Sequence, residues 1–272
     1  MRAVSPGALG HEAPGHVVGV TGPPGAGKSS LLSELCRAWR ADGRTVAVLA
    51  VDPSSRRSGG ALLGDRARIA FDPEDRGLFI RSTAAGDRLG GLAPATRAAA
   101  QALSAAFDVV VIETVGVGQS EVAIAELAQT TLVVLQPGSG DSIQVLKAGI
   151  MEIADVFVVN KADHPMADQL RREIRSAMEM LQWDGWVPEL VVTQALEGAG
   201  IDDLWSAIER HVAYLNETGE IEHRRREAFR HQVRQLALGR IEKRLEGALR
   251  NDDSVGIDPY EAADRIIERL GL

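Results

Sequence analysis

Residues 22–29 read GPPGAGKS, from Gly22 to Ser29, and fit the phosphate-binding pattern G-x-x-x-x-G-K-[ST] in full. The stretch directly follows the aliphatic run Val17–Val20, which predicts a strand, and it precedes a helical stretch. The glycines let the backbone curl so that successive N–H groups point at a polyphosphate, and the dipole of the next helix favours the same anion. A Gly- and Pro-rich turn without a ligand would not need this order of strand, motif and helix. The sequence therefore predicts a P-loop.

Each residue of this motif has an expected role in holding a nucleotide. Lys28 would reach the β and γ phosphate oxygens, and the Ser29 hydroxyl would bind Mg²⁺. The expected nucleotide contacts along the motif are Gly25, Ala26, Gly27, Lys28, Ser29 and Ser30. A nucleoside triphosphate and Mg²⁺ are therefore the expected cofactors.

A second motif predicts which base the nucleotide carries. The aliphatic run Val156–Val159 ends in Asn160-Lys161-Ala162-Asp163, and residues at the carboxyl end of a strand face the ligand crevice of an open sheet. The Asp163 carboxylate can accept hydrogen bonds from guanine N1–H and the 2-amino group together, a donor pair that adenine lacks. We expect Asn160 to brace the loop and the Lys161 stem to cover the base. The sequence thus predicts GTP and GDP as ligands.

A further base contact is expected directly after the last predicted strand. Gln194, Ala195 and Leu196 stand where GTPases commonly show a Ser-Ala pair against the base. Because Gln194 replaces the serine, this contact is weaker evidence for guanine than Asp163.

Acidic residues near strand ends are candidate Mg²⁺ ligands. The buried run Val109–Ile112 is followed by Glu113, whose carboxylate would hold Mg²⁺ through water, and by Gly116, whose N–H would sense the γ phosphate. Asp52 and Asp65 flank a Gly- and Ser-rich stretch that is typical of a mobile switch, although Asp52 could also be a turn former. The predicted metal ligands are Ser29, Asp52, Asp65 and Glu113.

The residues after Gly116 predict slow hydrolysis. Val117 stands where fast small GTPases carry a water-orienting glutamine, and its side chain cannot polarise water. Gln119, two residues later, is a candidate substitute. A third Gly-rich segment, residues 136–147, reads QPGSGDSIQVLK, and its chemistry fits a plain β–α loop and a nucleotide-ordered switch equally well.

Short aliphatic runs alternate with helical stretches along the chain. The runs predicted as strands are Val17–Val20, Thr45–Val51, Leu78–Arg81, Val109–Ile112, Thr131–Leu135, Val156–Val159 and Leu190–Thr193. Helices are expected over Ser29–Ala41, Pro94–Ala106, Asp168–Leu181 and Asp202–Leu215. This alternation requires right-handed crossovers and predicts an α/β fold with a mostly parallel sheet and helices on both faces.

The predicted organisation has three parts. Residues 1–16 show no periodicity and are expected to form an irregular leader, and residues 17–217 form the P-loop GTPase domain. Residues 218–272 are expected to form a helical extension, with one charged helix over Arg224–Gly247 and an amphipathic helix over Tyr260–Leu270. Such a tail either packs on the finished domain or contacts a second subunit.

Composition excludes several classes of function. The 272-residue chain has a formal net charge of −8, which argues against nucleic-acid binding through a basic surface. Its single cysteine, Cys36, cannot form an internal disulfide and indicates a reducing cytosol. No apolar stretch reaches about 18 residues, so we expect a cytoplasmic protein without a membrane partner. The histidines lack paired metal-ligand spacing, and His211 is interpreted as a helix cap.

The chain resembles the MeaB/ArgK group, to which MMAA is similar, a branch of the metallochaperone-type P-loop GTPases. The resemblance rests on Gly22–Ser29, Val51–Ser55, Gly59-Gly60, Leu63–Asp65, Ile80-Arg81, Leu89–Gly91, Glu113–Glu121, Pro137-Gly138, Gly140-Asp141, Gln144, Lys147–Gly149 and Asn160–Asp163. Glu113–Glu121 is the most specific of these, because ordinary GTPases show only Asp-x-x-Gly there. Members of this group are GTPase chaperones of adenosylcobalamin-dependent acyl-CoA mutases.

This resemblance implies roles for residues that their chemistry leaves open. Asp52, Asp65 and Glu113 would belong to the Mg²⁺ and switch apparatus. Asp141, Gln144 and Lys147 would belong to an extra switch that signals to the mutase, together with Gln119 of the preceding switch. The candidate catalytic residues are Lys28, Asp65, Glu113 and Lys147. The helical tail would be a dimerisation arm, which makes the expected assembly a homodimer.

The expected partner is therefore an adenosylcobalamin-dependent acyl-CoA mutase, and an adenosyltransferase of the same system stays open as a second partner. Two alternatives remain. A P-loop small-molecule kinase would use ATP, which Asn160–Asp163 argues against. An ATPase linked to amino-acid transport would need a surface that docks on a permease or a membrane, and the sequence offers neither.

Overall fold

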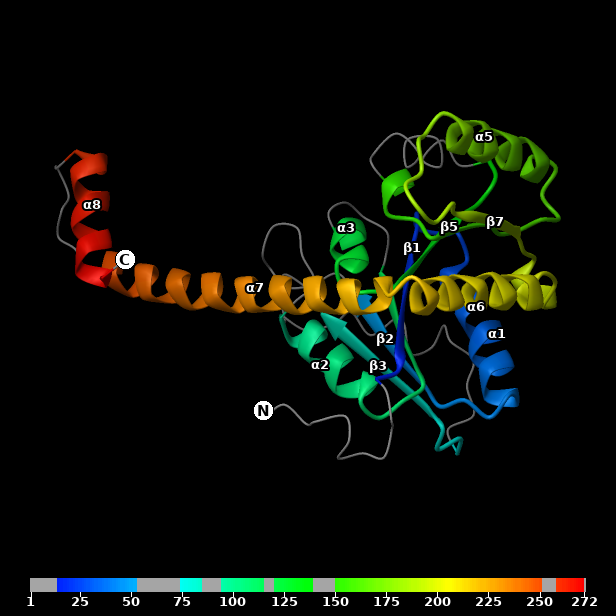
Figure 1. Ribbon diagram of the computed structural model, residues 1–272, viewed down its shortest axis with the longest axis horizontal. Coiled ribbons are helices and arrows are strands. Elements are labelled where there is room, and N and C mark those ends of the chain that lie inside the picture. Colours follow the sequence, from blue (N-terminus) through cyan, green and yellow to red (C-terminus); the bar gives the residue numbers. More distant parts are fainter. Residues whose placement is uncertain are drawn as a thin grey trace. The chain divides into compact units, whose positions relative to one another are not determined.

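The computed structural model describes residues 14–52, 74–84, 94–114, 120–138, 150–250 and 258–271. They contain a seven-stranded sheet in the order β3-β2-β4-β1-β5-β6-β7, in which every neighbouring pair is parallel (Figure 1). The strands are β1 (His16–Thr21), β2 (Val46–Asp52), β3 (Leu78–Ala84), β4 (Val109–Thr114), β5 (Thr130–Leu135), β6 (Val156–Val159) and β7 (Glu189–Val192). The predicted α/β fold is confirmed, with β1 beginning at His16, one residue inside the expected leader.

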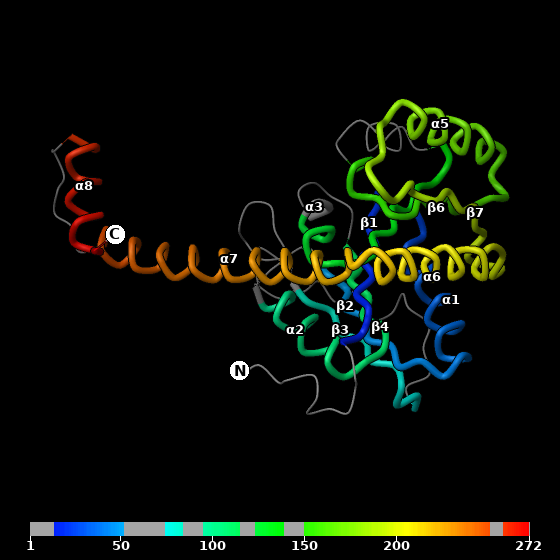
Figure 2. Tube along the Cα trace, viewed as in Figure 1, coloured from blue at the N-terminus to red at the C-terminus, as the bar shows by residue number. Residues whose placement is uncertain are grey.

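Helices lie between several of the strands and follow the last one, as the chain trace in Figure 2 shows. They are α1 (Lys28–Ala41), α2 (Pro94–Ser104), α3 (Ser120–Ala125), α5 (Ala167–Glu179), α6 (Ile201–Glu217), α7 (Glu220–Arg250) and α8 (Pro259–Leu270), with short 3-10 turns η3 (Ile150–Glu152) and η4 (Ala195–Glu197). The sequence did not predict α3, because six residues are less than two helical turns and carry little apolar periodicity.

Buried side chains alternate between the two faces of the sheet. On one face Val20 of β1 lies in a core cluster with Leu31 of α1 and Leu204 of α6. On the other face Val17 of β1 lies in a cluster with Ile124 of α3. Burial on both faces explains why the strands read as continuous aliphatic runs rather than as alternating patterns.

The strand order positions a crevice at the carboxyl end of β1. Strand β1 lies in the middle of the sheet, with β2, β3 and β4 on one side of it and β5, β6 and β7 on the other. Open α/β sheets bind ligands where the strand order reverses in this way, outside the carboxyl ends of the strands. The loop between β1 and α1 is the P-loop.

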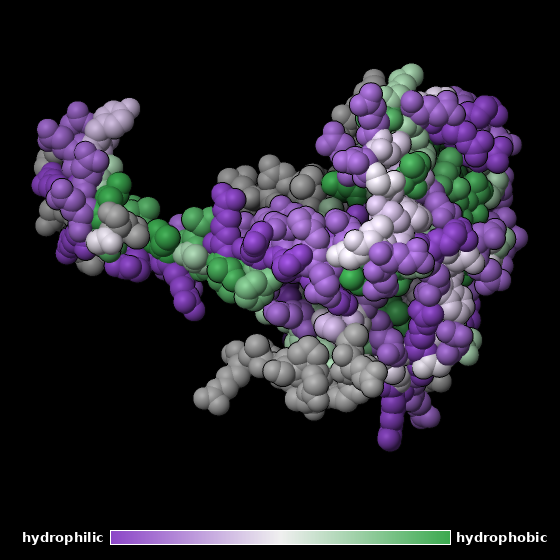
Figure 3. All heavy atoms as spheres, in the orientation of Figure 1, coloured by the Kyte–Doolittle hydropathy of each residue, from purple (hydrophilic) through white to green (hydrophobic). Residues whose placement is uncertain are grey.

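The structure divides into two compact units, Met1–Ala228 and Phe229–Leu272, and the division falls within α7. In the second unit Arg244 Nη2 donates to the carbonyl O of Leu270 at 2.6 Å, which ties α7 to α8. Apolar side chains gather along this unit (Figure 3), and its exposed members are Phe229, Val233, Leu236, Leu238, Ile241, Leu249, Tyr260 and Ile267. Among the helices of the described ranges, none is long and apolar enough to cross a membrane.

Candidate nucleotide-binding site

Close contacts require glycine at two positions of the P-loop. A Cβ atom at Gly22 would lie 1.9 Å from the carbonyl O of Val134, and one at Gly27 would lie 2.3 Å from Asn160 Nδ2. Both glycines also have positive φ, 138° and 86° respectively. The loop is therefore held against β5 and the Asn160 side chain, at distances that no larger residue permits.

Lys28 lies buried in the first turn of α1 and directs its charge at the loop. Its Nζ donates to the carbonyl O of Gly22 at 2.7 Å and to that of Pro23 at 3.0 Å. The N-terminus of α1 adds the positive end of its dipole at the same place. The loop thus combines an ammonium group and a helix N-terminus, an arrangement that suits a polyphosphate.

Two of the predicted metal ligands contact each other at the carboxyl edge of the sheet. Ser29 Oγ donates to Glu113 Oε1 at 2.8 Å, and Glu113 is buried at the end of β4. Hydroxyl and carboxylate oxygens are the hard donors that Mg²⁺ prefers. Asp52 ends β2, the strand next to β4, so its backbone lies at the same edge, whereas its side chain is outside what the structure describes. Within the described ranges no three His, Cys, Asp or Glu residues cluster as metal ligands.

Asn160 joins three segments at this edge. Its Nδ2 donates to the carbonyl O of Ala26 in the P-loop at 2.9 Å. Its Oδ1 accepts from Thr193 Oγ1 and from the backbone N of Ala195, each at 3.1 Å. The side chain is almost completely buried and both ends of its amide are hydrogen-bonded, so it ties the P-loop to the loops that follow β6 and β7.

Lys161 has a backbone conformation that is rare for its residue type. Its φ of 60° makes it the only described non-glycine residue with a positive φ. The exposed Nζ donates to Oε1 of Gln136, which follows β5. The stem of Lys161 thus extends toward the P-loop side of the site.

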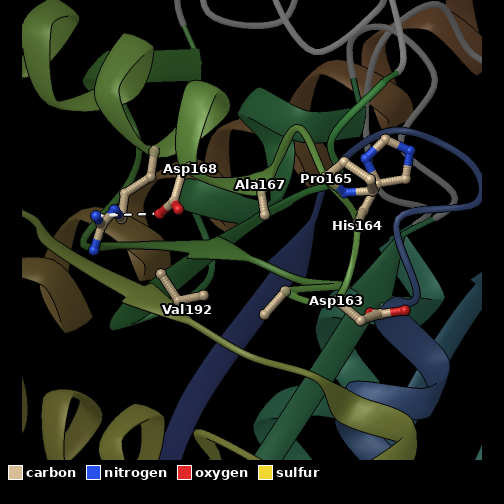
Figure 4. A pocket seen from close by; sticks show the side chains of 8 residues that line it. Asp163, His164, Pro165, Ala167, Asp168 and Val192 are labelled. Carbon is tan, nitrogen blue, oxygen red and sulfur yellow. Dashed lines mark ion pairs between the residues drawn. The ribbon is translucent and has the colours of Figure 1, made fainter.

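Asp163 stands beside a cavity of about 350 Å³ at the start of α5. In Figure 4, Asp163 lies at the opposite end of this cavity from Asp168, which pairs with Arg171 at 3.2 Å. Leu196 in η4 is 88% exposed and so leaves an apolar side chain open beside the base-binding loops. Six other candidate residues lie outside the described ranges: Asp65, Gly116, Gln119, Asp141, Gln144 and Lys147.

Sequence reasoning placed Thr193 and Gln136 in loops near the expected site but did not predict their contacts with Asn160 and Lys161. Thr193 directly follows β7 and Gln136 directly follows β5, so both lie at carboxyl ends of strands. A polar residue immediately after an aliphatic run was the available signal, as it was for Asn160.

A second polar cluster lies at the opposite, amino edge of the sheet, and it corrects the interpretation of His211. The interpretation as a helix cap is wrong, because His211 is fully buried within α6, which continues to Glu217. Its Nδ1 lies 2.8 Å from Thr130 Oγ1, and that hydroxyl lies 2.7 Å from His16 Nε2. On its other side His211 Nε2 lies 3.2 Å from Asp155 Oδ1.

Asp155 is the centre of this amino-edge cluster. Its Oδ2 accepts from the backbone N of Thr131 at 2.7 Å, and Arg224 of α7 donates to both carboxylate oxygens at 3.0 Å. Burial alone would raise the pKa of Asp155, but the hydrogen bond and charge of His211 and the charge of Arg224 outweigh burial and lower it. Arg224 also donates to the carbonyl O of Gln129 at 2.8 Å, which fixes the start of α7 to the sheet.

Comparison with known proteins gives relatives over most of the chain. The family model described as "Methylmalonyl Co-A mutase-associated GTPase MeaB" matches residues 8–250. A relative from Pyrococcus horikoshii, named as a GTPase, is 43% identical over 267 residues, covering 94% of this chain and 84% of that protein. GTPase ArgK of Escherichia coli is 39% identical over 211 residues, covering 75% and 64%. The mitochondrial methylmalonic aciduria type A homolog of Mus musculus is 36% identical over 210 residues, covering 75% and 51%.

Solved structures share the fold. A crystal structure of LAO/AO transport system kinase matches with a TM-score of 0.69 and 27% identity, covering 98% of this chain and 85% of that one. The hydrogenase maturation factor HypB from Archaeoglobus fulgidus matches with a TM-score of 0.53 at 15% identity, covering 73% and 90%, which is a likeness of fold alone. The resemblance and the GTPase activity predicted from the motifs are confirmed. The chain belongs to the MeaB family of P-loop GTPases.

Proposed function

We propose that this protein uses GTP binding and hydrolysis to act as a chaperone of an adenosylcobalamin-dependent acyl-CoA mutase, gating the loading or protection of the cofactor of the mutase. The observation that supports this best is the meeting of Lys28, Ser29–Glu113 and Asn160 at one sheet edge, in a family whose description names methylmalonyl-CoA mutase. The nucleotide state would bias the switch loops and hence their contacts with the mutase.

In this proposal the groups of the P-loop hold the triphosphate for attack by water. The backbone N–H groups of Gly25–Gly27 surround the phosphates, and Lys28 exchanges the carbonyls of Gly22 and Pro23 for β and γ phosphate oxygens. A fixed ammonium group stabilises the charge that develops on these oxygens in the transition state.

The donor set of Ser29 and Glu113 fits Mg²⁺, since both side chains supply oxygen within 2.8 Å of each other. Mg²⁺ bound there would neutralise charge on the β and γ phosphates. Asp52 and Asp65 are proposed to complete this set. Ser29 would ligate the ion directly, and Glu113 would act through water.

Guanine selection is proposed to rest on Asp163, with Lys161 over the base and Ala195 beside it. The carboxylate accepts from N1–H and the 2-amino group, so adenine would leave it unpaired. Because Asn160 ties this loop to the P-loop, the base and the phosphates would be held at a fixed spacing. Gln194 and Leu196 would line the remaining edge.

We further propose that intrinsic hydrolysis is slow and that the partner mutase accelerates it. Val117 offers no group to orient water, so the missing group or conformation would come from the complex. Asp141, Gln144, Lys147 and Gln119 would transmit the nucleotide state to the mutase.

The proposed assembly is a homodimer formed through the second unit. Six apolar side chains of α7 in this unit are at least 37% exposed: Phe229, Val233, Leu236, Leu238, Ile241 and Leu249. An apolar helical surface of this size favours contact with another protein surface. Light scattering at several protein concentrations measures this directly, and a monomer throughout would contradict it.

Two measurements test the proposed function. Calorimetric titration with GDP and ADP separates a guanine-specific GTPase from a kinase or transport ATPase, and equal affinity for both nucleotides would overturn the base assignment. Hydrolysis and pull-down assays with candidate acyl-CoA mutases, with and without a non-hydrolysable GTP analogue, test the chaperone role. That role fails if no mutase stimulates hydrolysis or binds in a nucleotide-dependent way.

A further inference from the structure

Gln136 occupies a bridging position between the phosphate loop and the base loop. It follows the last residue of β5, and the neighbouring strand β6 ends in register with it, since Leu135 pairs with Val159. The backbone N of Asn160 donates to the carbonyl O of Leu135 at 2.9 Å. Gln136 and the Asn160–Asp163 motif therefore leave the sheet side by side.

The Gln136 amide lies between the P-loop and Lys161. Its Nε2 lies against the P-loop, because a Cβ atom built on Gly25 would be 3.3 Å from this nitrogen. Its Oε1 accepts a hydrogen bond from Lys161 Nζ. One partly buried side chain therefore lies close to the phosphate loop and accepts a hydrogen bond from the lysine of the Asn160–Asp163 motif.

Lys161 needs such a partner for two physical reasons. A left-handed backbone costs a non-glycine residue about 1 kcal/mol or more, and it persists only where surrounding contacts fix it. A free lysine stem also samples many rotamers, so an unheld Lys161 would cover the base only part of the time. An amide oxygen that accepts from the ammonium group selects the extended rotamer.

From this geometry we infer that Gln136 is a positioning residue for guanine nucleotides: it holds Lys161 over the base and couples that contact to the P-loop, thereby slowing nucleotide release. The inference rests on the proposed nucleotide site and adds to it a residue outside the two sequence motifs. Gln136 itself need not touch the nucleotide, because it acts through Lys161 and Gly25.

The test measures dissociation of a fluorescent GDP analogue from the full chain by stopped flow. Gln136→Met keeps the length of the side chain but removes the acceptor, and we expect dissociation to become about tenfold faster. Gln136→Glu restores an acceptor for Lys161 and should stay within about threefold of the unaltered protein. Gln169→Met is the matched control, because Gln169 is an exposed glutamine of α5 whose Nε2 donates to Glu173 Oε1 on the same helix at 2.9 Å.

A double-mutant cycle separates positioning from a general loss of structure. Lys161→Met removes the ammonium group, so it breaks the same hydrogen bond, and the double variant should release GDP no faster than Lys161→Met alone. Thermal unfolding of the nucleotide-free variants should stay unchanged. Additive effects of the two substitutions, or no rescue by Gln136→Glu, would overturn the inference. If Lys161→Met itself leaves GDP release unchanged, the proposed base site fails and this inference fails with it.

Discussion

The two edges of the sheet use buried polar groups in opposite ways. At the carboxyl edge, Lys28 and Ser29 of the P-loop lie beside Glu113 and Asn160, and glycines with positive φ bring backbone close to these side chains. At the amino edge Asp155 accepts hydrogen bonds from backbone and from Arg224 and contacts His211. The carboxyl edge holds an ammonium group and a helix N-terminus at the P-loop, whereas the charged side chains of the amino edge pair with one another.

We therefore expect nucleotide binding and folding stability to depend on opposite edges of the sheet. Polar groups that satisfy one another contribute to folding and leave nothing for a ligand, so changes at the amino edge should alter the free energy of unfolding. Substitutions of the groups around the proposed nucleotide site should alter nucleotide affinity and have little effect on the free energy of unfolding. The following substitutions test that separation.

Asp155→Ala should give the largest effect. It removes the carboxylate between Arg224 and His211 and leaves buried donors without their acceptor, so the free energy of unfolding should fall by about 3–5 kcal/mol. Urea unfolding followed by circular dichroism measures the loss. The matched control is Glu189→Ala, which breaks an exposed pair with Arg210 and should cost about 1 kcal/mol or less. A similar small loss for both variants would mean that the amino-edge cluster is not a stabilising unit.

Asp163→Asn should weaken GDP binding about 100-fold while leaving unfolding unchanged. The amide replaces a charged acceptor pair with one acceptor and one donor, and the donor faces guanine groups that also donate. The same amide pairs with the 2-oxo group of xanthine, so affinity for xanthosine diphosphate should rise. Calorimetry with both nucleotides measures the exchange, and Asp168→Asn, on the other side of the cavity, is the control. Equal weakening of both nucleotides would argue against direct base recognition.

Glu113→Gln should raise the Mg²⁺ concentration needed for half-maximal hydrolysis about tenfold, because a neutral amide is a weaker outer ligand for a hard cation. Hydrolysis rates measured at saturating GTP over a range of Mg²⁺ concentrations give this midpoint. Ser29 Oγ keeps an oxygen acceptor in this variant, so thermal unfolding without nucleotide should change little. An unchanged Mg²⁺ midpoint would remove Glu113 from the metal site.

The sheet was predictable because each strand is a short aliphatic run buried on both faces. Val109–Ile112 and Val156–Val159 carry this pattern without interruption, and all seven runs became strands. Local sequence does not encode the strand order, however. The contact between Ser29 and Glu113, 84 residues apart, depends on β1 lying next to β4, which only the whole sheet determines.

The candidate site was predictable where a motif fixes backbone and side chain together, as in Gly22–Ser29 and Asn160–Asp163. It was not predictable for Gln136, whose role depends on the distance between two loops. The misreading of His211 has a similar cause: a histidine near the C-terminal end of a helical pattern looks like a cap, and only the packing of α6 over β5 buries it. Sequence pattern gives the elements, and tertiary contact assigns the polar residues to an edge.

A pH dependence of stability is also expected to arise at the amino edge. Burial, and after it the charges of His211 and Arg225, lower the pKa of His16 from 6.5 to about 3. The unfolded chain therefore takes up a proton as the pH falls through 6.5, whereas the folded protein does not, so this contribution to stability is complete above pH 6.5 and declines below it. The slope contributed by His16 is at most about 1.4 kcal/mol per pH unit.

Urea unfolding between pH 5 and 8 should show this decline in stability. His16→Gln, which keeps a polar group near Thr130, should reduce the dependence of the free energy of unfolding on pH. His223→Gln, at an exposed position of α7, is the control, and an unaltered slope in His16→Gln would show that other groups carry the acid sensitivity of this edge.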